Sequence, residues 1–460
     1  MKTYAHHKPH LALFLLLFTL SACQQVGKPD LARLYKTKPS QHQHPPVVLL
    51  HGIMGSKLRH SASLDELWFG NLSTLLFSNY ESIRLHIDSE TLQPIEDQGE
   101  PFAIADKAAG IDYYQAIIKT LTQYGAYQLT EINTLADNLN RKLYVFIYDW
   151  RQDNVSSACK LHTFIEQIKK DHNNPDLKVD LVAHSMGGLI SRYYLRYGET
   201  DVLDDNAFPV NQQGAQHVRR VVLLGTPNLG SVGSVHSFIT GLRVGLRTIP
   251  TEVLVTMPSI YQLFPHNISS WVVNIQGETL DRDVFDVRIW ERFQWSIFDP
   301  KVRQRIISDF DDANSGQAYL KTLERYFEKH IERARRFLWS LTVRVDNPQY
   351  ELIVMGGDCD MTPARLLIEE VKGESVTRLN PSDIKKPLSG VDYEALMLEP
   401  GDGTVTKASL LSRDALDPTV ERHKYSFFPI DYPIFLCEDH GTLTSNINFQ
   451  DNLLNIVLSH

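Results

Sequence analysis

One serine of the chain, Ser185, lies in a sequence that could turn its hydroxyl group into a nucleophile. The apolar run Val179–Ala183 leads to it, Gly187 and Gly188 follow it, and helical spacing begins directly afterwards. A strand, a sharp turn and a helix in that order form the nucleophile elbow of serine hydrolases, which raises the serine above a parallel sheet. The pattern Ala-His-Ser-Met-Gly therefore predicts acyl transfer through Ser185, and a helix-capping serine is the alternative.

A glycine-rich turn near the start of the chain could stabilise negative charge on a substrate oxygen. The apolar run Val47–Leu50 ends in the sequence His-Gly-Ile-Met-Gly-Ser. In hydrolases with a nucleophile elbow, one backbone N–H comes from such a turn and another from the residue after the nucleophile. We expect an oxyanion hole formed by Ile53 and Met186, with Met54 as the alternative to Ile53. His51 is interpreted as structural, because it precedes the turn and has no acidic partner in view.

Alternating strands and helices must hold these groups, and the apolar patterns of the chain predict them. Short apolar runs bounded by turns predict buried strands, and apolar residues at helical spacing predict helices. Their alternation favours a mostly parallel sheet with helices on both faces. We expect an excursion from this core at residues 57–110. Strands are expected at 47–50, 143–147, 178–183, 220–224, 350–357 and 425–428, and helices at 111–127, 155–170, 189–197 and 445–458.

The other members of a catalytic triad are expected after the later strands, in the chain order serine, acid, histidine. His440 follows the last expected strand and is the predicted base, whereas His423 and His460 lie away from that edge of the sheet. Two aspartates compete for the role of the acid. Asp358 directly follows an expected strand, and Asp402 lies in a turn between two glycines.

The cysteines predict one disulfide bond. Cys359 and Cys437 follow expected strands that should be neighbours at the catalytic edge, so we expect them to pair and to clamp the loops of Asp402 and His440. A Cα separation well above about 7 Å would exclude this bond. Two buried thiols are the alternative. An odd number of cysteines after Cys23 leaves at least one free thiol.

A long insertion at residues 231–349 separates the two parts of the expected core, 47–230 and 350–460. It contains four tryptophans and an amphipathic pattern at 317–339, so we expect a helical cap. At its start, glycines interrupt the apolar residues of the segment 232–250. Such a segment suits a mobile lid, because glycine permits backbone changes at its ends. A fixed cap helix is the alternative.

The N-terminal residues predict export and lipid attachment. An apolar run at residues 11–20 follows two lysines, which suits a signal peptide and is too short to span a bilayer. The run ends in Leu-Ser-Ala-Cys, which is similar to the bacterial lipobox, so we expect cleavage of residues 1–22 and acylation of Cys23. An ordinary secretory signal is the alternative. Residues 23–46 are then a tether, and Gln24 favours the outer membrane of a bacterial envelope.

The charge of the chain argues against a nucleic-acid partner. The formal net charge is -9, and no basic domain is available to displace counterions from phosphates. Two histidines of the tether, His42 and His44, are interpreted as solvated residues. No metal or other cofactor is therefore assigned.

Five motifs together resemble the lecithin:cholesterol acyltransferase family, which includes lysosomal phospholipase A2. The resemblance runs from about Val47 to the C-terminus and implies an α/β-hydrolase fold with an N-terminal excursion and a helical cap or lid. It also implies Asp402, rather than Asp358, as the triad acid. The motifs are HGIMGSKL at 51–58, YDWR at 148–151, AHSMG at 183–187, LGTPNLGS at 224–231 and GDGTV at 401–405.

The triad and the resemblance predict a serine-dependent hydrolase of lipid acyl esters, of the phospholipase A or lipase type, or an O-acyltransferase. Both activities would pass through an acyl-serine intermediate. The expected substrate is a glycerophospholipid or an acylglycerol, and the lipid anchor would bring the protein to a membrane. A non-catalytic lipid-binding envelope protein with the same fold is the alternative.

Overall fold

The computed structural model describes most of the chain after its N-terminal segment. The described residues are 28–35, 44–70, 78–95, 99–105, 107–108, 111–112, 114–137, 140–417 and 419–459. The expected signal peptide and Cys23 lie outside them. Within the described ranges, no helix has both the length and the apolar character needed to cross a membrane.

A seven-stranded sheet forms the core, and every neighbouring pair of its strands is parallel. The order across the sheet is β19-β14-β10-β9-β1-β8-β7. Because all strands run the same way, their carboxyl ends meet at one edge, where the loops that carry the candidate site begin. The strands are β1 (Val47–Leu50), β7 (Tyr127–Leu129), β8 (Arg141–Phe146), β9 (Val179–His184), β10 (Val218–Leu224), β14 (Glu351–Gly357) and β19 (Tyr432–Leu436).

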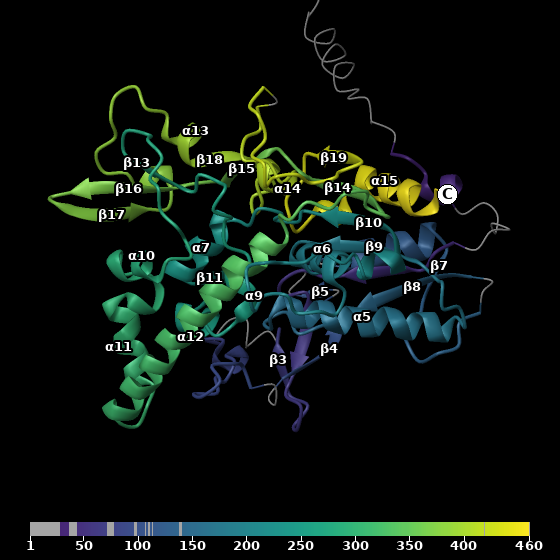
Figure 1. The fold of residues 1–460 in the computed structure, drawn as a ribbon, viewed down its shortest axis with the longest axis horizontal. Coiled ribbons are helices and arrows are strands. Elements are labelled where there is room, and N and C mark those ends of the chain that lie inside the picture. The colour runs from purple at the N-terminus through teal and green to yellow at the C-terminus, as the bar shows by residue number, and fades with distance from the viewer. Residues whose placement is uncertain are drawn as a thin grey trace, which may run out of the picture.

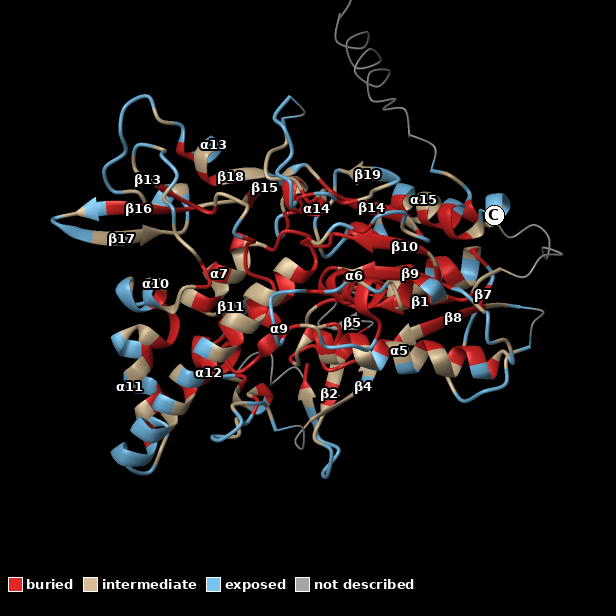
Figure 2. Ribbon diagram, viewed as in Figure 1, coloured by how far each residue is buried: buried red, intermediate tan, exposed pale blue. Residues whose placement is uncertain are grey.

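Helices cover both faces of the sheet, as the alternation of elements predicts (Figure 1). Along β1, Val48 and Leu50 pack into one apolar cluster, and Val47 and Leu49 pack into another on the opposite face. A strand that is buried on both faces reads as a continuous apolar run, which explains the four apolar residues of β1. Figure 2 shows these strands as largely buried. One face carries α5 (Asn154–Asp171) and α6 (Met186–Tyr197), and the other carries α4 (Gln115–Lys119) and α15 (Ile447–Leu458).

The segment between β1 and β7 leaves the sheet and returns. The helix expected at 111–127 is wrong in its extent: only α4 and the π-helical η2 (Thr120–Tyr124) are helical. The hydroxyl groups of Thr120 and Thr122 donate to carbonyl oxygens four residues earlier, which bends a helix, and the chain then enters β7. The other elements are β2 (Ser56–Arg59), β3 (Glu66–Trp68), η1 (Glu81–Ile83), β4 (Glu100–Ile104), β5 (Lys107–Ala108) and β6 (Ile111–Asp112).

The insertion after β10 is mainly helical and lies beside the carboxyl edge of the sheet (Figure 1). Its longest element, α12 (Ala313–Ser340), contains the helix expected at 317–339 and buries Leu323, Phe327 and Ala334 along one face. The lid candidate at 232–250 is a helix followed by a hairpin, α7 (Val232–Thr240), β11 (Leu242–Val244) and β12 (Arg247–Ile249). The remaining elements are α8 (Thr251–Leu254), α9 (Pro258–Tyr261), β13 (Val272–Asn274), α10 (Val287–Arg292), η4 (Ser296–Phe298) and α11 (Pro300–Ser308).

The chain returns to the core with β14 and then leaves it again. In this second departure, β16 (Leu366–Val371) pairs in parallel with β13 of the insertion, and β17 (Glu374–Arg378) pairs with β16. The cap sheet is therefore built from both sides of β14. The accompanying elements are β15 (Asp360–Pro363), η5 (Pro381–Asp383), α13 (Tyr393–Met397), β18 (Leu398–Gly401) and α14 (Lys407–Leu410).

The last strand of the core differs from the sequence prediction. A strand at 425–428 is wrong; the strand is β19, which begins at Tyr432 and contains Pro433. Proline is tolerated there because β19 pairs with β14 alone, at the edge of the sheet. Phe428 is instead buried, with the Arg192 guanidinium 4.5 Å from the centre of its ring.

Candidate active site

Ser185 lies between β9 and α6 in a backbone conformation that few non-glycine residues adopt, with φ 55° and ψ -124°. Such a conformation costs free energy and persists only where the surroundings impose it. The Ser185 N–H donates to the Leu224 carbonyl oxygen of β10 at 2.7 Å. At Gly187, a Cβ atom would lie 2.5 Å from the His51 carbonyl oxygen, so glycine lets α6 begin close to the first turn. This is the strand, turn and helix geometry expected from the sequence.

His440 connects Ser185 to Asp402. Its Nε2 lies 3.0 Å from Ser185 Oγ, and its Nδ1 lies 2.8 Å from Asp402 Oδ2. A carboxylate only accepts, so Nδ1 carries the proton and Nε2 can accept the serine proton. The backbone N–H of His440 also donates to the Asp402 carbonyl oxygen at 2.9 Å, which fixes the two residues relative to each other. The structure thus brings together the three residues proposed as a triad from the sequence.

The surroundings of Asp402 keep its carboxyl group ionised. Burial raises its pKa, but His440 and two backbone N–H groups outweigh burial and hold the pKa below its usual range. The two N–H groups belong to Thr404 and Val405 and donate to Oδ1 at 3.0 and 2.7 Å. One carboxylate oxygen is therefore held by the turn, and the other faces the histidine.

The pKa of His440 is raised above its ordinary value of 6.5. Burial alone would lower this pKa, because it disfavours the charged ring. The nearby Asp402 carboxylate outweighs burial by attracting the imidazolium and by accepting its proton in a hydrogen bond. The site therefore favours the protonated, positively charged form of the His440 ring.

The other acidic and histidine candidates lie apart from the triad. Asp358 forms an ion pair with Lys407 at 2.7 Å instead of contacting His440. His423 is exposed, and its Nδ1 accepts from the Tyr425 N–H at 3.3 Å. His460 lies outside the described residues.

The first glycine-rich turn passes directly beside the nucleophile. A Cβ atom at Gly52 would lie only 2.7 Å from Ser185 Cβ, so only glycine allows this approach. The Gly55 N–H donates to the Gly52 carbonyl oxygen at 3.2 Å, which closes the turn around Ile53 and Met54. Within the described part of the chain, no group accepts a hydrogen bond from the backbone N–H of Ile53 or Met54. The expected donor Ile53 and its alternative Met54 therefore each have a backbone N–H that the described residues leave available, so the choice between them stays open.

His51 holds this turn from behind. The Tyr148 N–H donates to its Nε2 at 3.3 Å, so Nδ1 carries the proton and donates to the Gly52 carbonyl oxygen at 2.8 Å. The ring also stacks on Tyr148, with the centroids 4.0 Å apart. Burial lowers the pKa of His51 to about 4, which keeps the ring neutral. These contacts agree with the structural role expected from its position.

A disulfide bond joins Cys359 and Cys437 directly after β14 and β19, with a Cα separation of 5.0 Å. This distance is below the limit of about 7 Å that would have excluded the bond. The bond connects the ends of two neighbouring strands. Cys437 lies three residues before His440, and Asp360, next to Cys359, forms an isolated β-bridge with Asp402. Cys159, on α5, is a free thiol that is partly buried.

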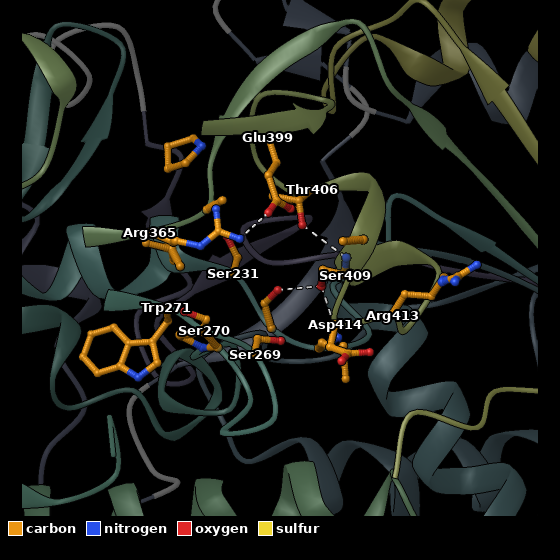
Figure 3. A pocket seen from close by; sticks show the side chains of 17 residues that line it. Ser231, Ser269, Ser270, Trp271, Arg365, Glu399, Thr406, Ser409, Arg413 and Asp414 are labelled. Carbon is orange, nitrogen blue, oxygen red and sulfur yellow. Dashed lines mark hydrogen bonds and ion pairs between the residues drawn. The ribbon is translucent and has the colours of Figure 1, made fainter. Parts of the chain in front are cut away.

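Polar side chains behind the acid loop connect it to the LGTPNLGS turn (Figure 3). Ser231 Oγ donates to the Thr404 carbonyl oxygen at 2.7 Å, and Ser409 Oγ donates to the Gly230 carbonyl oxygen at 2.6 Å. Ser231 and Ser409 line a cleft that Figure 3 shows from close by. Arg365 and Glu399 line the same cleft and form an ion pair at 2.6 Å. The loop that carries Asp402 is thus connected to the LGTPNLGS turn by side-chain hydrogen bonds.

Sequence reasoning missed two side chains beside the triad, Tyr114 and His184. Both are buried or nearly so, and the Tyr114 hydroxyl lies 2.9 Å from His184 Nδ1. Tyr114 falls within the helix expected at 111–127, and His184 is the histidine of the Ala-His-Ser-Met-Gly pattern. A contact between residues 70 positions apart leaves no local signal in the sequence.

One group of side chains away from the triad has the geometry of metal ligands: His162, Glu166 and His217. The ammonium group of Lys169 already occupies this place, because it lies 2.7 Å from Glu166 Oε1 and 3.1 Å from His217 Nδ1. A cation at this place supplies the charge that a metal would bring, so we assign no metal to these residues.

Comparison with known proteins places these observations in a family. The family model described as lecithin:cholesterol acyltransferase matches residues 106–339. An uncharacterised protein of Saccharomyces cerevisiae is 24% identical over 253 residues, which cover 53% of this chain and 33% of the yeast protein. The chain thus spans about a third of the length of this relative.

Solved structures resemble this chain at low sequence identity. A chain of the Tle4–Tli4 complex is 14% identical with a TM-score of 0.54, and the match covers 90% of this chain and 98% of that one. The lipase of Staphylococcus hyicus is 13% identical with a TM-score of 0.36, and the match covers 94% and 98% of the two chains. The parallel sheet, the elbow and the flanking helices are those of the α/β-hydrolase fold.

Proposed function

The chain belongs to the lecithin:cholesterol acyltransferase family, and on that premise we propose that it cleaves acyl esters of lipids through an acyl-serine intermediate. One observation carries the proposal. Ser185 Oγ contacts His440 Nε2 at 3.0 Å, and His440 Nδ1 contacts Asp402 Oδ2 at 2.8 Å. This is the arrangement of a Ser-His-Asp catalytic triad.

Each of these three side chains has its own role in the acylation step. Ser185 Oγ attacks the ester carbonyl carbon while His440 Nε2 takes the hydroxyl proton, and Asp402 stabilises the resulting imidazolium. The backbone N–H groups of Ile53 and Met186 donate to the oxyanion of the tetrahedral intermediate. Removal of one such donor costs about 3–4 kcal/mol of transition-state stabilisation in comparable enzymes. The intermediate then collapses, and the departing lipid alcohol takes the proton from His440.

The acceptor in the second half of the reaction is water or a lipid alcohol. His440 removes a proton from that acceptor, the acceptor oxygen attacks the acyl carbon, and the Ser185 oxygen leaves with the proton. Water gives a free fatty acid, and an alcohol gives a new ester. Glycerophospholipids fit the proposal best, since lecithin, which the description of the family names, is a glycerophospholipid, and acylglycerols carry the same kind of ester bond to glycerol.

A product analysis separates these outcomes. The protein would be incubated with phospholipids and acylglycerols that carry a labelled acyl chain, with and without a long-chain alcohol or a sterol. A new labelled ester that depends on the added alcohol supports acyl transfer, and labelled fatty acid alone restricts the activity to hydrolysis. No product from any donor, in wild-type protein that also fails to react with a fluorophosphonate probe, would favour the non-catalytic lipid-binding alternative.

We further propose that Cys23 is acylated and anchors the protein in the outer membrane of a bacterial envelope. The support is the Leu-Ser-Ala-Cys sequence after the apolar run at residues 11–20. Two or more acyl chains on one residue give stable membrane attachment, whereas a single chain gives only marginal binding. Mass spectrometry of the N-terminal peptide of the mature protein tests this, because acyl groups on Cys23 support it and an unmodified N-terminus at another residue rejects it.

A further inference from the structure

We propose that Tyr114 and His184 are positioning residues, which hold the oxyanion turn and the catalytic histidine in register through one directed chain of hydrogen bonds. This inference rests on the proposed function. Gly52 follows β1, Tyr114 precedes α4, His184 ends β9, and His440 follows β19. These hydrogen bonds therefore join four separate segments of the fold.

The direction of each hydrogen bond follows from the chemistry of the groups. The Gly52 N–H donates to the Tyr114 hydroxyl oxygen at 2.7 Å. At the other end, the His440 carbonyl oxygen can only accept, so His184 Nε2, at 3.3 Å, carries the proton and donates. His184 Nδ1 is then an acceptor and receives the hydroxyl proton of Tyr114 at 2.9 Å. Every member therefore donates in the same sense, from the turn toward the base.

The neutral state of the His184 ring preserves this direction. The pKa of His184 is lowered to about 3, mainly by burial and also by the nearby His440 ring, while Asp402 acts in the opposite sense. His184 and His440 lie side by side, with ring centroids 4.8 Å apart. Of these two histidines, the one bound to the carboxylate takes the proton, because Asp402 contacts His440 and the His184 ring faces Tyr114 and a carbonyl oxygen.

Both ends of this hydrogen-bond chain determine the geometry of the proposed reaction. At one end, the Gly52 backbone lies against Ser185, and the orientation of this turn decides where the Ile53 N–H points. At the other end, the His440 carbonyl belongs to the loop that aims the imidazole at the serine. Tyr114 is 3% exposed, so its hydroxyl lies in a place that water does not readily reach. Catalysis is sensitive to such positions, because a displacement of about 1 Å can cost about a hundredfold in rate.

The test compares Tyr114→Phe with Tyr127→Phe. Tyr127 is equally buried at 3% exposure, and its hydroxyl also donates a hydrogen bond, to the Val457 carbonyl oxygen at 3.4 Å, far from the triad. The two variants therefore lose the same atom from similar surroundings. For a soluble short-chain ester, we expect Tyr114→Phe to lower kcat by about 10- to 100-fold and to change KM by less than about threefold. Tyr127→Phe should keep wild-type values of both.

A second measurement separates positioning from a loss of folding. The rate at which a fluorophosphonate probe phosphonylates Ser185 should fall in Tyr114→Phe by the same factor as kcat, because that reaction uses the same oxyanion site and the same base. His184→Gln keeps one acceptor and one donor on the side chain, so it should retain more activity than His184→Phe, which keeps neither. The thermal midpoints of the variants, measured alongside, show whether each is folded.

The outcomes distinguish this inference from the proposed function. If Tyr114→Phe and Tyr127→Phe have equal kcat, or if His184→Gln and His184→Phe lose activity equally while both are folded, the positioning role is overturned. If wild-type protein neither hydrolyses esters nor reacts with the probe, the proposed function itself fails. A selective loss of kcat in folded Tyr114→Phe, with partial rescue by glutamine at position 184, supports the inference.

Discussion

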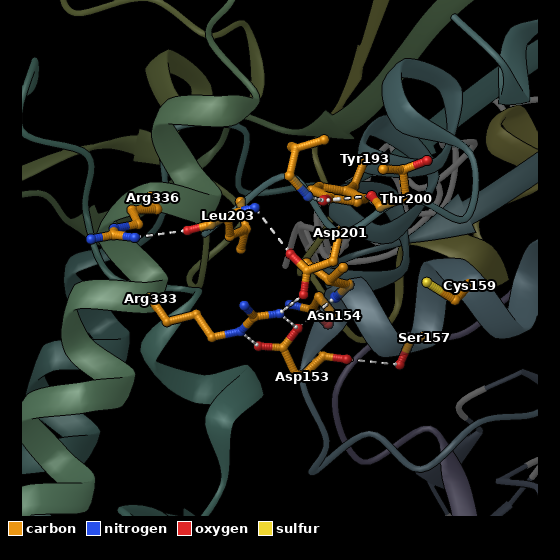
Figure 4. Close-up of polar contacts among 12 residues, drawn as sticks. Asp153, Asn154, Ser157, Cys159, Tyr193, Thr200, Asp201, Leu203, Arg333 and Arg336 are labelled. Carbon is orange, nitrogen blue, oxygen red and sulfur yellow. Dashed lines mark hydrogen bonds and ion pairs between the residues drawn. The ribbon is translucent and has the colours of Figure 1, made fainter. Parts of the chain in front are cut away.

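The carboxyl edge of the sheet and the cap are held in place by different kinds of contact. At the sheet edge, backbone groups connect the loops, such as the Ser185 N–H with the Leu224 carbonyl and the Gly225 N–H with the Met355 carbonyl. At the junction of cap and core, charged side chains do so, as in the contact of Arg333 with Asp153 (Figure 4). The loops that carry Ser185, Asp402 and His440 are therefore held mainly through the backbone of the sheet, whereas the cap is attached through charged side chains that can be changed without altering the sheet.

The largest expected effect is the loss of the nucleophile. Ser185→Ala should lower kcat by about 10⁶-fold, since removal of the serine from a triad costs about that factor in comparable enzymes. The thermal stability of this variant should be at least that of the wild type, because the substitution removes only one oxygen atom and leaves no large cavity. Steady-state kinetics and a thermal melt on the same preparation check both. An activity within tenfold of the wild type would place the nucleophile elsewhere.

Removal of the triad acid should have the next largest effect and should also move the pH profile. In the wild type, kcat/KM should fall as the pH drops through the raised pKa of His440, above 6.5, because the imidazolium cannot accept the serine proton. Asp402→Asn should lower kcat by about 10⁴-fold. Its acidic limb should shift to a lower pH, because burial still opposes the charged ring and the carboxylate that outweighed burial is gone.

Asp358→Asn is the matched control for this shift. Asp358 pairs with Lys407 and does not contact His440, so its loss should leave the acidic limb where it is in the wild type. An acidic limb that moves in Asp358→Asn, and stays in place in Asp402→Asn, would exchange the roles of the two aspartates.

At the cap junction, stability should respond more than chemistry. Arg333 on α12 donates to both oxygens of Asp153, at 2.8 and 3.2 Å, and to Asp201 at 2.7 Å. Arg333→Met leaves the partly buried Asp153 carboxylate and the exposed Asp201 carboxylate without that donor, so we expect a loss of about 1–3 kcal/mol in the free energy of unfolding, mainly from Asp153. Because the sheet edge is intact, kcat for a soluble ester should fall less than tenfold.

A surface arginine provides the control for the cap junction. Arg288 pairs with Asp286, but its side chain is 84% exposed, so Arg288→Met should leave the thermal midpoint unchanged. Equal melting behaviour of Arg333→Met and Arg288→Met would show that the charged junction does not hold the cap.

The smallest expected effect concerns the lid hypothesis. Within the segment 232–250, the part that could move or contact lipid is the hairpin of β11 and β12. Val235 and Phe238 of α7 are fully buried, whereas Leu246 at the hairpin turn is 76% exposed. If the hairpin contacts lipid, Leu246→Asp should reduce, by several-fold, the rise in activity that occurs when a short-chain ester aggregates. Activity on the monomeric ester should be unchanged.

Leu135→Asp is the control for the hairpin. Leu135 is 86% exposed on the loop between β7 and β8, outside the cap. This variant should keep the full rise. If the wild-type protein shows no rise at the aggregation threshold, the lid hypothesis fails and the hairpin is a static part of the cap.

The sequence predicted the central strands because each is a continuous apolar run buried on both faces, as in β1 and β9. It predicted Ser185 because that residue follows such a strand. It predicted His440 from the chain order serine, acid, histidine, although the strand before His440 is β19 and not the expected 425–428. The edge strand β19 was missed, because it contains Pro433 and because the neighbouring residues 425–428 resemble a strand more closely. Pairing of β13 with β16 joins residues about 94 positions apart, and no local pattern records it. The contact of Tyr114 with His184 was invisible for the same reason.

The central claim is that an acyl group is carried on Ser185, and acid quenching during turnover tests it most directly. The wild-type protein would be mixed with an excess of a labelled acyl ester, quenched within one turnover, digested and mapped by mass spectrometry. The account predicts an acyl adduct on the peptide that contains Ser185, and no adduct in Ser185→Ala treated in the same way. Product formation with an adduct on another residue, or an adduct that persists in Ser185→Ala, would contradict it.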